Sequence, residues 1–296
     1  MKHGRLFGAG TALVTPFTHD GAVDEQALRA LIDWQIGEGI HFLVPCGSTG
    51  EAATLSPDEH RRVVEITVEQ VAGRVPVIAG AGSNDTRKAI AFSREMKAAG
   101  ATHLLHVSPM YNKPPQRGII AHFQAIADAV DLPIVLYNVP GRTASNMDAE
   151  TTLKLAENAR LVAVKEASGD MAQIGRIIRD RPDGFSVLSG DDALTVAIMA
   201  AGGDGVISVT SNATPKLVAQ LTESVRAGNM RRARDIEARL ADWTAAAFVE
   251  SNPLPVKAAL AMQGRIENVL RLPLVPLADA HQSAVRRSLE QTGALG

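Results

Sequence analysis

The sequence predicts a single (β/α)8 barrel that is followed by a small helical extension. Short apolar runs alternate with amphipathic helical patterns, and eight such units follow one another along the chain. The apolar runs are nearly continuous in hydrophobicity, as expected of strands that are covered on both faces. Because the units are regular and no long insertion separates them, a closed barrel is favoured over a doubly wound open sheet.

The strands are predicted where the apolar runs lie, and with their helices they occupy residues 1–226, which we expect to form the catalytic barrel. The predicted strands are Gly10–Val14, Phe42–Pro45, Val77–Ala79, His103–Val107, Ile134–Tyr137, Val162–Lys165, Ser186–Leu188 and Gly205–Ser208.

The helices between the strands carry recognisable start signals. Ser56, Pro57 and Glu59 form a capping box with proline at the first helical position. An earlier helix is expected from about Asp24, with apolar residues on one face. A third begins at Asn84-Asp85-Thr86 and ends at Gly100.

Residues 227–296 carry no strand pattern and are expected to form a helical extension packed on the barrel. Ala238 and Leu240 are assigned to the apolar positions of its first helix, and Pro253-Leu254-Pro255 to a break in the chain. The predicted helices are Arg231–Phe248, Val256–Met262 and Asp279–Gln291.

Composition narrows the class of protein. Hydrophobic residues make up 46% of the 296 residues, charged residues 21%, and the net charge is −2, which is typical of a soluble globular protein and argues against nucleic acid as a partner. The single cysteine, Cys46, excludes an internal disulfide and fits a reducing compartment. The N-terminal residues lack the long apolar run of a signal peptide, and no segment reaches membrane-spanning length, so we expect a cytoplasmic protein.

No cofactor or metal is expected. The glycines of Gly8-Ala9-Gly10 and Gly80-Ala81-Gly82 lack the spacing and the downstream acid of a dinucleotide fingerprint. The eight histidines form no metal-binding pattern such as H-E-x-x-H. Cys46 lies beside a polar loop, but no base is evident for it, and we interpret it as a packing residue.

Lys165 is the first candidate for chemistry, because it ends the apolar run that begins at Leu161. Active sites of such barrels lie at the carboxyl ends of the strands. A desolvated lysine loses its proton more easily and becomes a nucleophile for a ketone. The alternatives are a pair with Glu166 or a side chain that extends to the surface, and position alone does not separate them.

Hydroxyl groups gather at other predicted strand ends. Tyr111 and Tyr137 are the only two tyrosines, and either could shuttle a proton near an imine or be an ordinary packed aromatic residue. Ser48 and Thr49 lie between glycines, where backbone amides could bind a carboxylate; the alternative is a simple strand-to-helix turn. Arg142 follows the fifth strand and suits a carboxylate, or a surface salt bridge.

The motifs GSTGE (47–51), YNVPGRT (137–143), KEASGD (165–170) and SGDD (189–192) occupy these strand ends. With GTALVTPF near the start and NPLPVKAAL near the end, the chain resembles the dihydrodipicolinate synthase and N-acetylneuraminate lyase superfamily over essentially its whole length. Arg142 is similar to the arginine that holds the carboxylate of aspartate semialdehyde in the synthases. Ser48 departs from their pattern, since the synthases usually carry two threonines and GSTGE is common among the lyases and sugar-acid aldolases.

The resemblance implies a lyase in lysine and diaminopimelate biosynthesis that condenses pyruvate with L-aspartate 4-semialdehyde through a Schiff base on Lys165. Its proton relay would run from Tyr137 through Thr49 or Ser48 to Tyr111 of a neighbouring subunit, and such enzymes are usually tetramers, as dimers of dimers. The implied substrate contacts are Thr49, Gly190 and the backbone of Ile207 for pyruvate, and Arg142 for the aldehyde.

Two alternative functions are compatible with part of this pattern. A pyruvate-releasing aldolase acting on a sugar acid or 4-hydroxy-2-oxoglutarate would use the same lysine, and Arg142 argues against it. A barrel that binds keto acids without turnover is the third possibility, and the intact Lys165, Tyr137 and Tyr111 argue against that.

The resemblance also bears on inhibition by lysine. Inhibited relatives bind lysine at a subunit interface, and His60 and Asn84 match contacts of that cleft. Lys88 stands where sensitive members carry a glutamate, and Met110 where they carry a tyrosine. A reversed charge turns attraction for the ammonium groups of lysine into repulsion, so weak or absent inhibition is expected.

Overall fold

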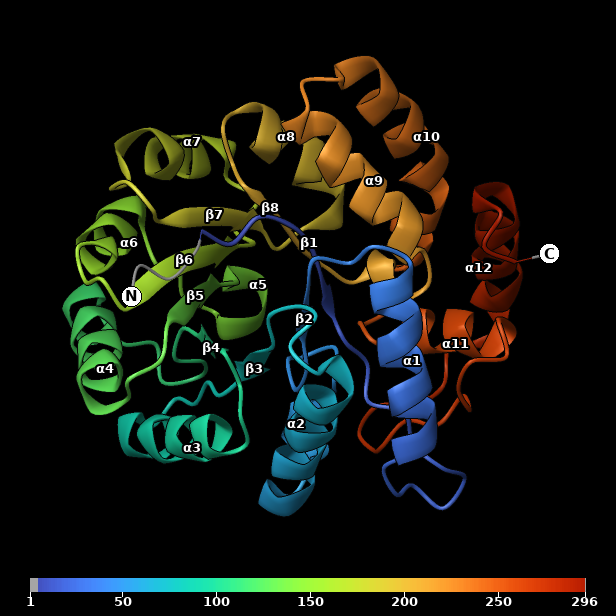
Figure 1. Ribbon diagram of the computed structural model, residues 1–296, viewed down its shortest axis with the longest axis horizontal. Coiled ribbons are helices and arrows are strands. Elements are labelled where there is room, and N and C mark those ends of the chain that lie inside the picture. Colours follow the sequence, from blue (N-terminus) through green and yellow to red (C-terminus); the bar gives the residue numbers. More distant parts are fainter. Residues whose placement is uncertain (1–4, 296) are drawn as a thin grey trace.

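The computed structural model describes residues 5–295 and has the predicted barrel, with eight parallel strands at the centre and helices around them (Figure 1). Residues 1–4 and Gly296 lie outside the described residues. Residues 1–4 belong to the predicted barrel domain and to the N-terminal segment that we expect not to be a signal peptide. The strands are β1 (Gly8–Ala12), β2 (Phe42–Val44), β3 (Ile78–Gly80), β4 (His103–Val107), β5 (Ile134–Asn138), β6 (Leu161–Glu166), β7 (Ser186–Ser189) and β8 (Gly205–Ser208).

The barrel closes between β2 and β3. The continuous sheet runs in the order β2-β1-β8-β7-β6-β5-β4-β3, and a parallel bridge from Leu43 to Val77 joins its two ends. The Leu43 amide donates to the Pro76 carbonyl at 3.0 Å, and the Gly80 amide donates to the Pro45 carbonyl at 3.0 Å. Pro45 and Pro76 have no amide hydrogen to donate, so few backbone hydrogen bonds join β2 to β3.

Seven predicted strands overlap the observed ones closely, whereas the first lies two residues too far along the chain. It begins at Gly8 rather than Gly10 and ends at Ala12. The strand includes glycines because there is no room for a side chain: a Cβ at position 10 would lie 1.9 Å from the ring of Phe42. Glycines do not contribute to an apolar pattern, so the pattern alone places the strand too late. Beyond its end, the Val14 amide donates to the side chain of Asn212 rather than to a neighbouring strand.

The helices cover the outside of the barrel, and the short α5 lies over the strands in the centre of the view (Figure 1). The helices that belong to the βα units are α1 (Glu25–Gly37), α2 (Pro57–Val71), α3 (Thr86–Ala98), α4 (Gln116–Ala129), α5 (Pro140–Thr143), α6 (Ala149–Ala156), α7 (Met171–Asp180), α8 (Thr195–Ala200) and α9 (Pro215–Arg226). Single 3-10 turns are η1 (Ala52–Thr54), η2 (Asp192–Leu194) and η3 (Thr210–Asn212).

The predicted helix starts are confirmed. Ser56 caps α2 in a capping box: its hydroxyl accepts from the Glu59 amide at 3.2 Å, and its own amide donates to the Glu59 carboxylate at 2.9 Å. Asp24 caps α1. The cap of α3 is Asp85, whose carboxylate accepts from two amides of the first turn.

The C-terminal region consists of α10 (Met230–Ala246), α11 (Leu254–Met262) and α12 (Asp279–Thr292), on one side of the barrel (Figure 1). Two expectations about it are wrong. Ala238 is exposed, and the buried side of α10 contains Ala233, Ile236, Leu240 and Trp243. The second helix, α11, begins at Leu254, before the predicted Val256, because a proline in the first turn needs no amide bond and Pro255 therefore fits inside the helix.

Apolar side chains form two buried clusters. One fills the space between the strands and the helices, and the other fills the barrel interior and includes Phe42, Leu105 and Tyr137. The inward-facing residues of β5 and β6 therefore meet among apolar side chains toward the carboxyl end of the barrel. Within residues 5–295, no helix has both the length and the apolar character needed to cross a membrane.

His106 is a titratable group in the outer cluster. It points from β4 toward α3, where its Nε2 lies 3.0 Å from the Ser93 hydroxyl, and that hydroxyl donates to the Ala89 carbonyl. Nε2 therefore carries the hydrogen, and Nδ1 has no hydrogen-bond partner among the described residues. Burial, with a smaller contribution from His122, lowers the pKa of His106 from 6.5 to about 3.

We predict that His106 makes the fold sensitive to acid. Below pH 6.5 the unfolded chain binds a proton at this residue that the native protein does not, so the free energy of unfolding falls by up to about 1.4 kcal/mol per pH unit. His106→Gln removes the proton site and should flatten this dependence when unfolding by urea is measured between pH 8 and pH 5. The difference between the two proteins at pH 8 gives the packing loss alone. An unchanged slope would contradict the prediction.

Candidate active site

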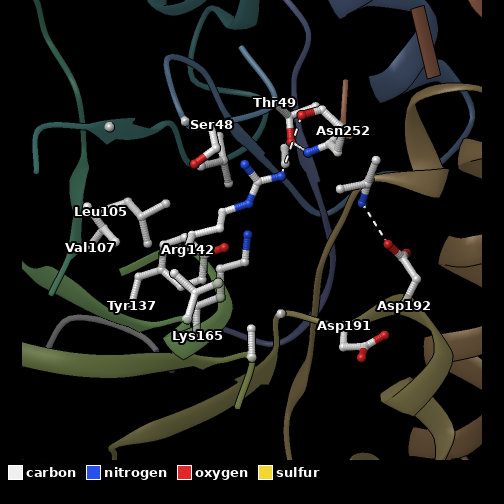
Figure 2. A pocket seen from close by; sticks show the side chains of 18 of the residues that line it. Ser48, Thr49, Leu105, Val107, Tyr137, Arg142, Lys165, Asp191, Asp192 and Asn252 are labelled. Atoms are coloured by element: carbon white, nitrogen blue, oxygen red, sulfur yellow. Dashed lines mark hydrogen bonds between the residues drawn. The ribbon is translucent and has the colours of Figure 1, made fainter. Parts of the chain in front are cut away.

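A cavity of about 1060 Å³ opens at the carboxyl end of the strands, where the sequence predicts the site. Figure 2 shows that its polar side chains come from different βα units and from the C-terminal region. Of the residues proposed from sequence, those that line the cavity are Ser48, Thr49, Tyr137, Arg142, Lys165 and Gly190.

Lys165 lies inside the barrel because of strand alternation. In β6, Ala163 and Lys165 face the interior, whereas Glu166 faces outward and its carboxylate accepts hydrogen bonds from Asn138 and the Ser168 amide. The alternative that Lys165 pairs with Glu166 is therefore wrong, as is a side chain that reaches the surface, since Lys165 is only 6% exposed.

The electrostatics of the cavity activate this amine. Burial lowers the pKa of Lys165 from 10.5 to about 8; Asp192 opposes the shift and Arg142 adds to it. About a tenth of the amine is thus unprotonated at pH 7, far more than for an ordinary lysine, and this is the form that attacks a carbonyl.

Tyr137 lies beside Lys165 on the neighbouring strand. The two residues are paired in register between β5 and β6, and the Lys165 Nζ lies 4.3 Å from the centre of the Tyr137 ring. Burial raises the pKa of Tyr137 to about 12, so its hydroxyl stays protonated and can donate.

The loop after β2 carries Ser48 and Thr49. Thr49 is buried, and its hydroxyl accepts a hydrogen bond of 2.9 Å from the side-chain amide of Asn252, whereas Ser48 is exposed (Figure 2). Thr49 is thus held by the C-terminal extension. The link from Tyr137 to these hydroxyls stays a prediction.

Arg142 enters the cavity from α5. Its guanidinium approaches the Asn252 carbonyl at 3.4 Å, and Figure 2 shows its side chain extended past Lys165 toward Thr49. A free guanidinium face beside an activated amine can bind a carboxylate of a molecule that reacts there.

Gly190 gives Lys165 its space. A Cβ at position 190 would lie 2.8 Å from the Ala167 Cβ and 3.0 Å from the Lys165 Cγ, so any side chain here would displace the lysine stem. Ile207 lies in β8 with its side chain buried in the barrel interior, outside the set that lines the cavity.

Tyr111 lies away from the site of its own chain. It is 89% exposed, has a φ of 71°, and does not line the cavity. The residues that match the lysine-binding cleft of inhibited relatives lie as follows. His60 is buried, the Asn84 side chain donates to the Met110 carbonyl, and Lys88 is exposed on α3.

Two residues of the site were missed by sequence reasoning. Asn252 lies between Thr49 and Arg142, and its side-chain oxygen is buried without a partner among the described residues. Asp192 accepts from the Val209 amide at 2.9 Å and the Thr210 hydroxyl at 2.7 Å, and burial raises the pKa of its carboxyl. Both lie in motifs noted above, NPLPVKAAL and SGDD, but only the folded chain brings them into the same cavity as Lys165.

Residues 5–295 contain no cluster of three or more His, Cys, Asp or Glu side chains that could hold a metal ion. A buried, activated lysine at the carboxyl end of a strand, in a closed (β/α)8 barrel, defines the class of Schiff-base-forming barrel enzymes.

Within this class, the chain belongs to the dihydrodipicolinate synthetase family, whose model matches residues 5–292. A 4-hydroxy-tetrahydrodipicolinate synthase of Koribacter versatilis is 50% identical over 292 residues, which are 98% of this chain and 97% of the relative. One of Pelobacter propionicus is 50% identical over 286 residues, 97% of this chain and 98% of the relative.

Solved structures agree with this. The dihydrodipicolinate synthase of Acinetobacter baumannii in complex with pyruvate has a TM-score of 0.96 and 40% identity, over 98% of this chain and 99% of that one. The synthase of Cyanidioschyzon merolae with lysine bound has a TM-score of 0.95 and 42% identity, over 99% of both chains. A monomeric synthase variant has a TM-score of 0.96 and 41% identity, over 98% of both chains.

The lowered pKa of Lys165 should be visible in its reactivity. Only the free amine reacts with acetic anhydride, so the labelling rate of Lys165, followed by mass spectrometry of its peptide, should rise with pH to a midpoint near 8 rather than 10.5. Arg142→Met removes a nearby cation and should move the midpoint upward. A midpoint near 10.5 in the unmodified protein would show that the amine is not desolvated.

Proposed function

We propose that the protein condenses pyruvate with L-aspartate 4-semialdehyde to 4-hydroxy-tetrahydrodipicolinate, the reaction named for its relatives. The observation that carries this proposal is the pairing of an activated amine, Lys165, with the guanidinium of Arg142 across one cavity. The lysine supplies covalent chemistry on a keto acid, and the arginine supplies a contact for the carboxylate of a second substrate.

The reaction begins when the Lys165 amine attacks C2 of pyruvate and water leaves, which forms an imine. Loss of a methyl proton gives an enamine, whose carbon attacks the aldehyde carbon of the semialdehyde. The substrate's own amine then attacks the imine carbon and displaces Lys165, which closes the ring and frees the enzyme.

The other site residues act on protons and orientation. Tyr137 is the proton carrier next to the imine, because its protonated hydroxyl can donate and then recover a proton. Thr49 and Gly190 contact pyruvate together with the backbone of Ile207, and Ser48 or Thr49 links Tyr137 to Tyr111. Arg142 orients the aldehyde. Ser48 is the one feature that favours a sugar-acid aldolase, and it keeps the hydroxyl that the relay needs, whereas Arg142 favours the semialdehyde reaction.

The functional unit is proposed to be a homotetramer built as a dimer of dimers, with Tyr111 entering the site of a neighbouring subunit. The exposure of this aromatic side chain supports the proposal, since it leaves Tyr111 free to reach another chain. Within each chain, residues 1–226 are proposed as the catalytic barrel and residues 227–296 as a helical extension.

The first test is covalent trapping. Borohydride should reduce the pyruvate imine onto Lys165, mass spectrometry should find the adduct there, and Lys165→Ala should abolish it, because no other side chain in the cavity is an amine. An adduct on another lysine would refute the assignment.

Arg142→Ala should weaken the use of aspartate semialdehyde far more than that of pyruvate. A charge-assisted contact contributes about 1.5–3 kcal/mol, so kcat/KM for the semialdehyde should fall about tenfold to over a hundredfold. Steady-state kinetics with each substrate varied in turn measures the difference. Normal use of the semialdehyde by the variant would favour a pyruvate-releasing aldolase instead.

Tyr111→Phe and Tyr137→Phe should each lower turnover by about a hundredfold, the size of an acid–base contribution, while folding stays intact. If Tyr111 crosses a subunit boundary, mixing inactive Tyr111→Phe and Lys165→Ala chains should restore part of the activity. No recovery in verified mixed oligomers would mean that each site is built within one chain.

A further inference from the structure

A buried ion pair ties the C-terminal extension to the loop that carries Thr49. The Lys257 Nζ donates to the Glu51 carboxylate at 2.6 Å and to the Thr15 carbonyl at 2.9 Å, and both charged side chains are fully buried. The Thr15 hydroxyl in turn donates to the Gly50 carbonyl at 2.7 Å. Three motifs far apart in the sequence, GTALVTPF, GSTGE and NPLPVKAAL, therefore meet beneath one loop.

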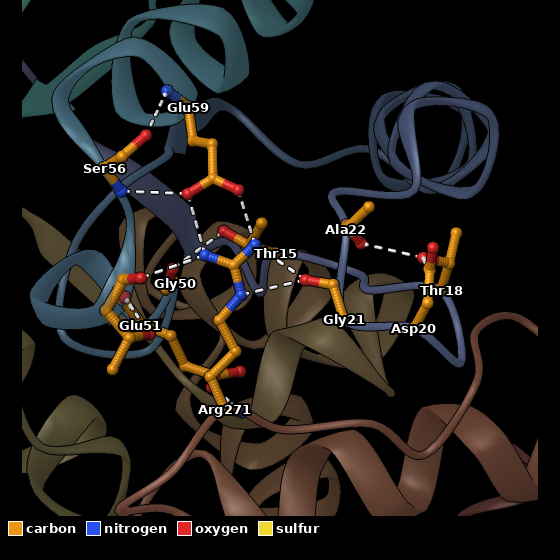
Figure 3. Close-up of polar contacts among 11 residues, drawn as sticks. Thr15, Thr18, Asp20, Gly21, Ala22, Gly50, Glu51, Ser56, Glu59 and Arg271 are labelled. Atoms are coloured by element: carbon orange, nitrogen blue, oxygen red, sulfur yellow. Dashed lines mark hydrogen bonds and ion pairs between the residues drawn. The ribbon is translucent and has the colours of Figure 1, made fainter.

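Arg271 also bonds to this loop and to the start of α2 (Figure 3). Its backbone amide donates to Glu51 at 3.2 Å, and its guanidinium donates to the Thr54 carbonyl and binds the Glu59 carboxylate with two bonds of 2.5 and 2.8 Å. Lys257 and Arg271 also lie 4.2 and 4.4 Å from the ring centre of Phe17. Two cations and an aromatic ring thus surround the end of the GSTGE loop.

The loop needs this support because its backbone conformation at Glu51 is strained. Glu51 has a φ of 54°, in the left-handed region that residues with a Cβ adopt at a cost. The hydrogen bond from Asn252 to Thr49 lies two residues upstream, so the segment that carries Lys257 fixes the loop at both points. A shift at Glu51 would be felt directly at Thr49.

Stability alone is a weak reason for such a pair. Removing two charges from water costs about as much free energy as their attraction returns, and an apolar pair of the same size often serves equally well. A buried ion pair does hold the two backbone segments that carry it in a defined arrangement, since each charged group needs its partner at a defined position.

We propose that Glu51 and Lys257 are positioning residues for the reaction, which hold Thr49 in its place beside pyruvate and make the helical extension part of the active site. This inference rests on the function proposed above. It assigns the two residues no contact with substrate: they act through the loop.

The test compares variants that separate position from stability. The double variant Glu51→Gln/Lys257→Met has no buried charge and keeps an oxygen for the Arg271 amide, so its fold should persist. Thr15→Val is a milder change that removes only the hydroxyl bond to Gly50. The control is Gln263→Met, which removes two hydrogen bonds between the end of α11 and residues 213 and 294, away from the loop.

Active sites are counted by borohydride trapping at saturating pyruvate, and kinetic constants are expressed per trapped site. For the double variant we expect KM for pyruvate to rise about tenfold and kcat to fall about tenfold, with KM for the semialdehyde within about twofold of the parent. Thr15→Val should raise KM for pyruvate about threefold. Gln263→Met should lower the melting temperature and leave both constants unchanged.

Unchanged constants per trapped site in both loop variants would overturn the inference and leave the pair a purely structural feature, as would equal losses in Gln263→Met. If the double variant traps no pyruvate at all, the KM of Thr15→Val for pyruvate decides the question, and an unchanged KM would overturn the inference. If the parent protein itself traps no pyruvate, the proposed function fails instead, so the two failures are distinguishable.

Discussion

Desolvation of the Lys165 amine is the constraint on which the site depends. A closed ring of parallel strands brings the inward side chains of β5 and β6 together in an apolar interior, and the missing side chain of Gly190 leaves room for the lysine stem. Since the charged ammonium is disfavoured there, the pKa of the amine falls to about 8 and more of it is in the reactive form near neutral pH. An open sheet would expose the same lysine to water and lose this effect.

Opposite charges limit how far the shift goes. Asp192 favours the ammonium form, while Arg142 opposes it and also offers a carboxylate contact in the same cavity. The two residues come from η2 and α5, on different sides of β6. Burial thus sets the direction of the pKa shift of Lys165, and two side chains from segments that are distant in the sequence adjust its size.

The C-terminal helices are more than a cover for the barrel. Asn252 bonds to Thr49, Lys257 to Glu51, and Arg271 to Glu51 and Glu59, so one segment of about twenty residues holds the loop after β2 from beneath. Loops over a barrel mouth carry function but have few bonds of their own, and here an outside segment supplies those bonds.

Local patterns in the sequence predicted the barrel, its eight strands within about two residues, the capping box of α2 and the lysine at the end of β6, because strand periodicity and cap chemistry are local. Strand-end position also singled out Tyr137, Thr49 and Arg142, and the motif resemblance implied their roles. Contacts in the folded chain were needed to show that Lys165 faces inward while Glu166 faces out, that Asn252 and Asp192 join the site, and that Lys257 is buried against Glu51. Those outcomes depend on contacts between residues as much as 206 positions apart, which no local pattern encodes.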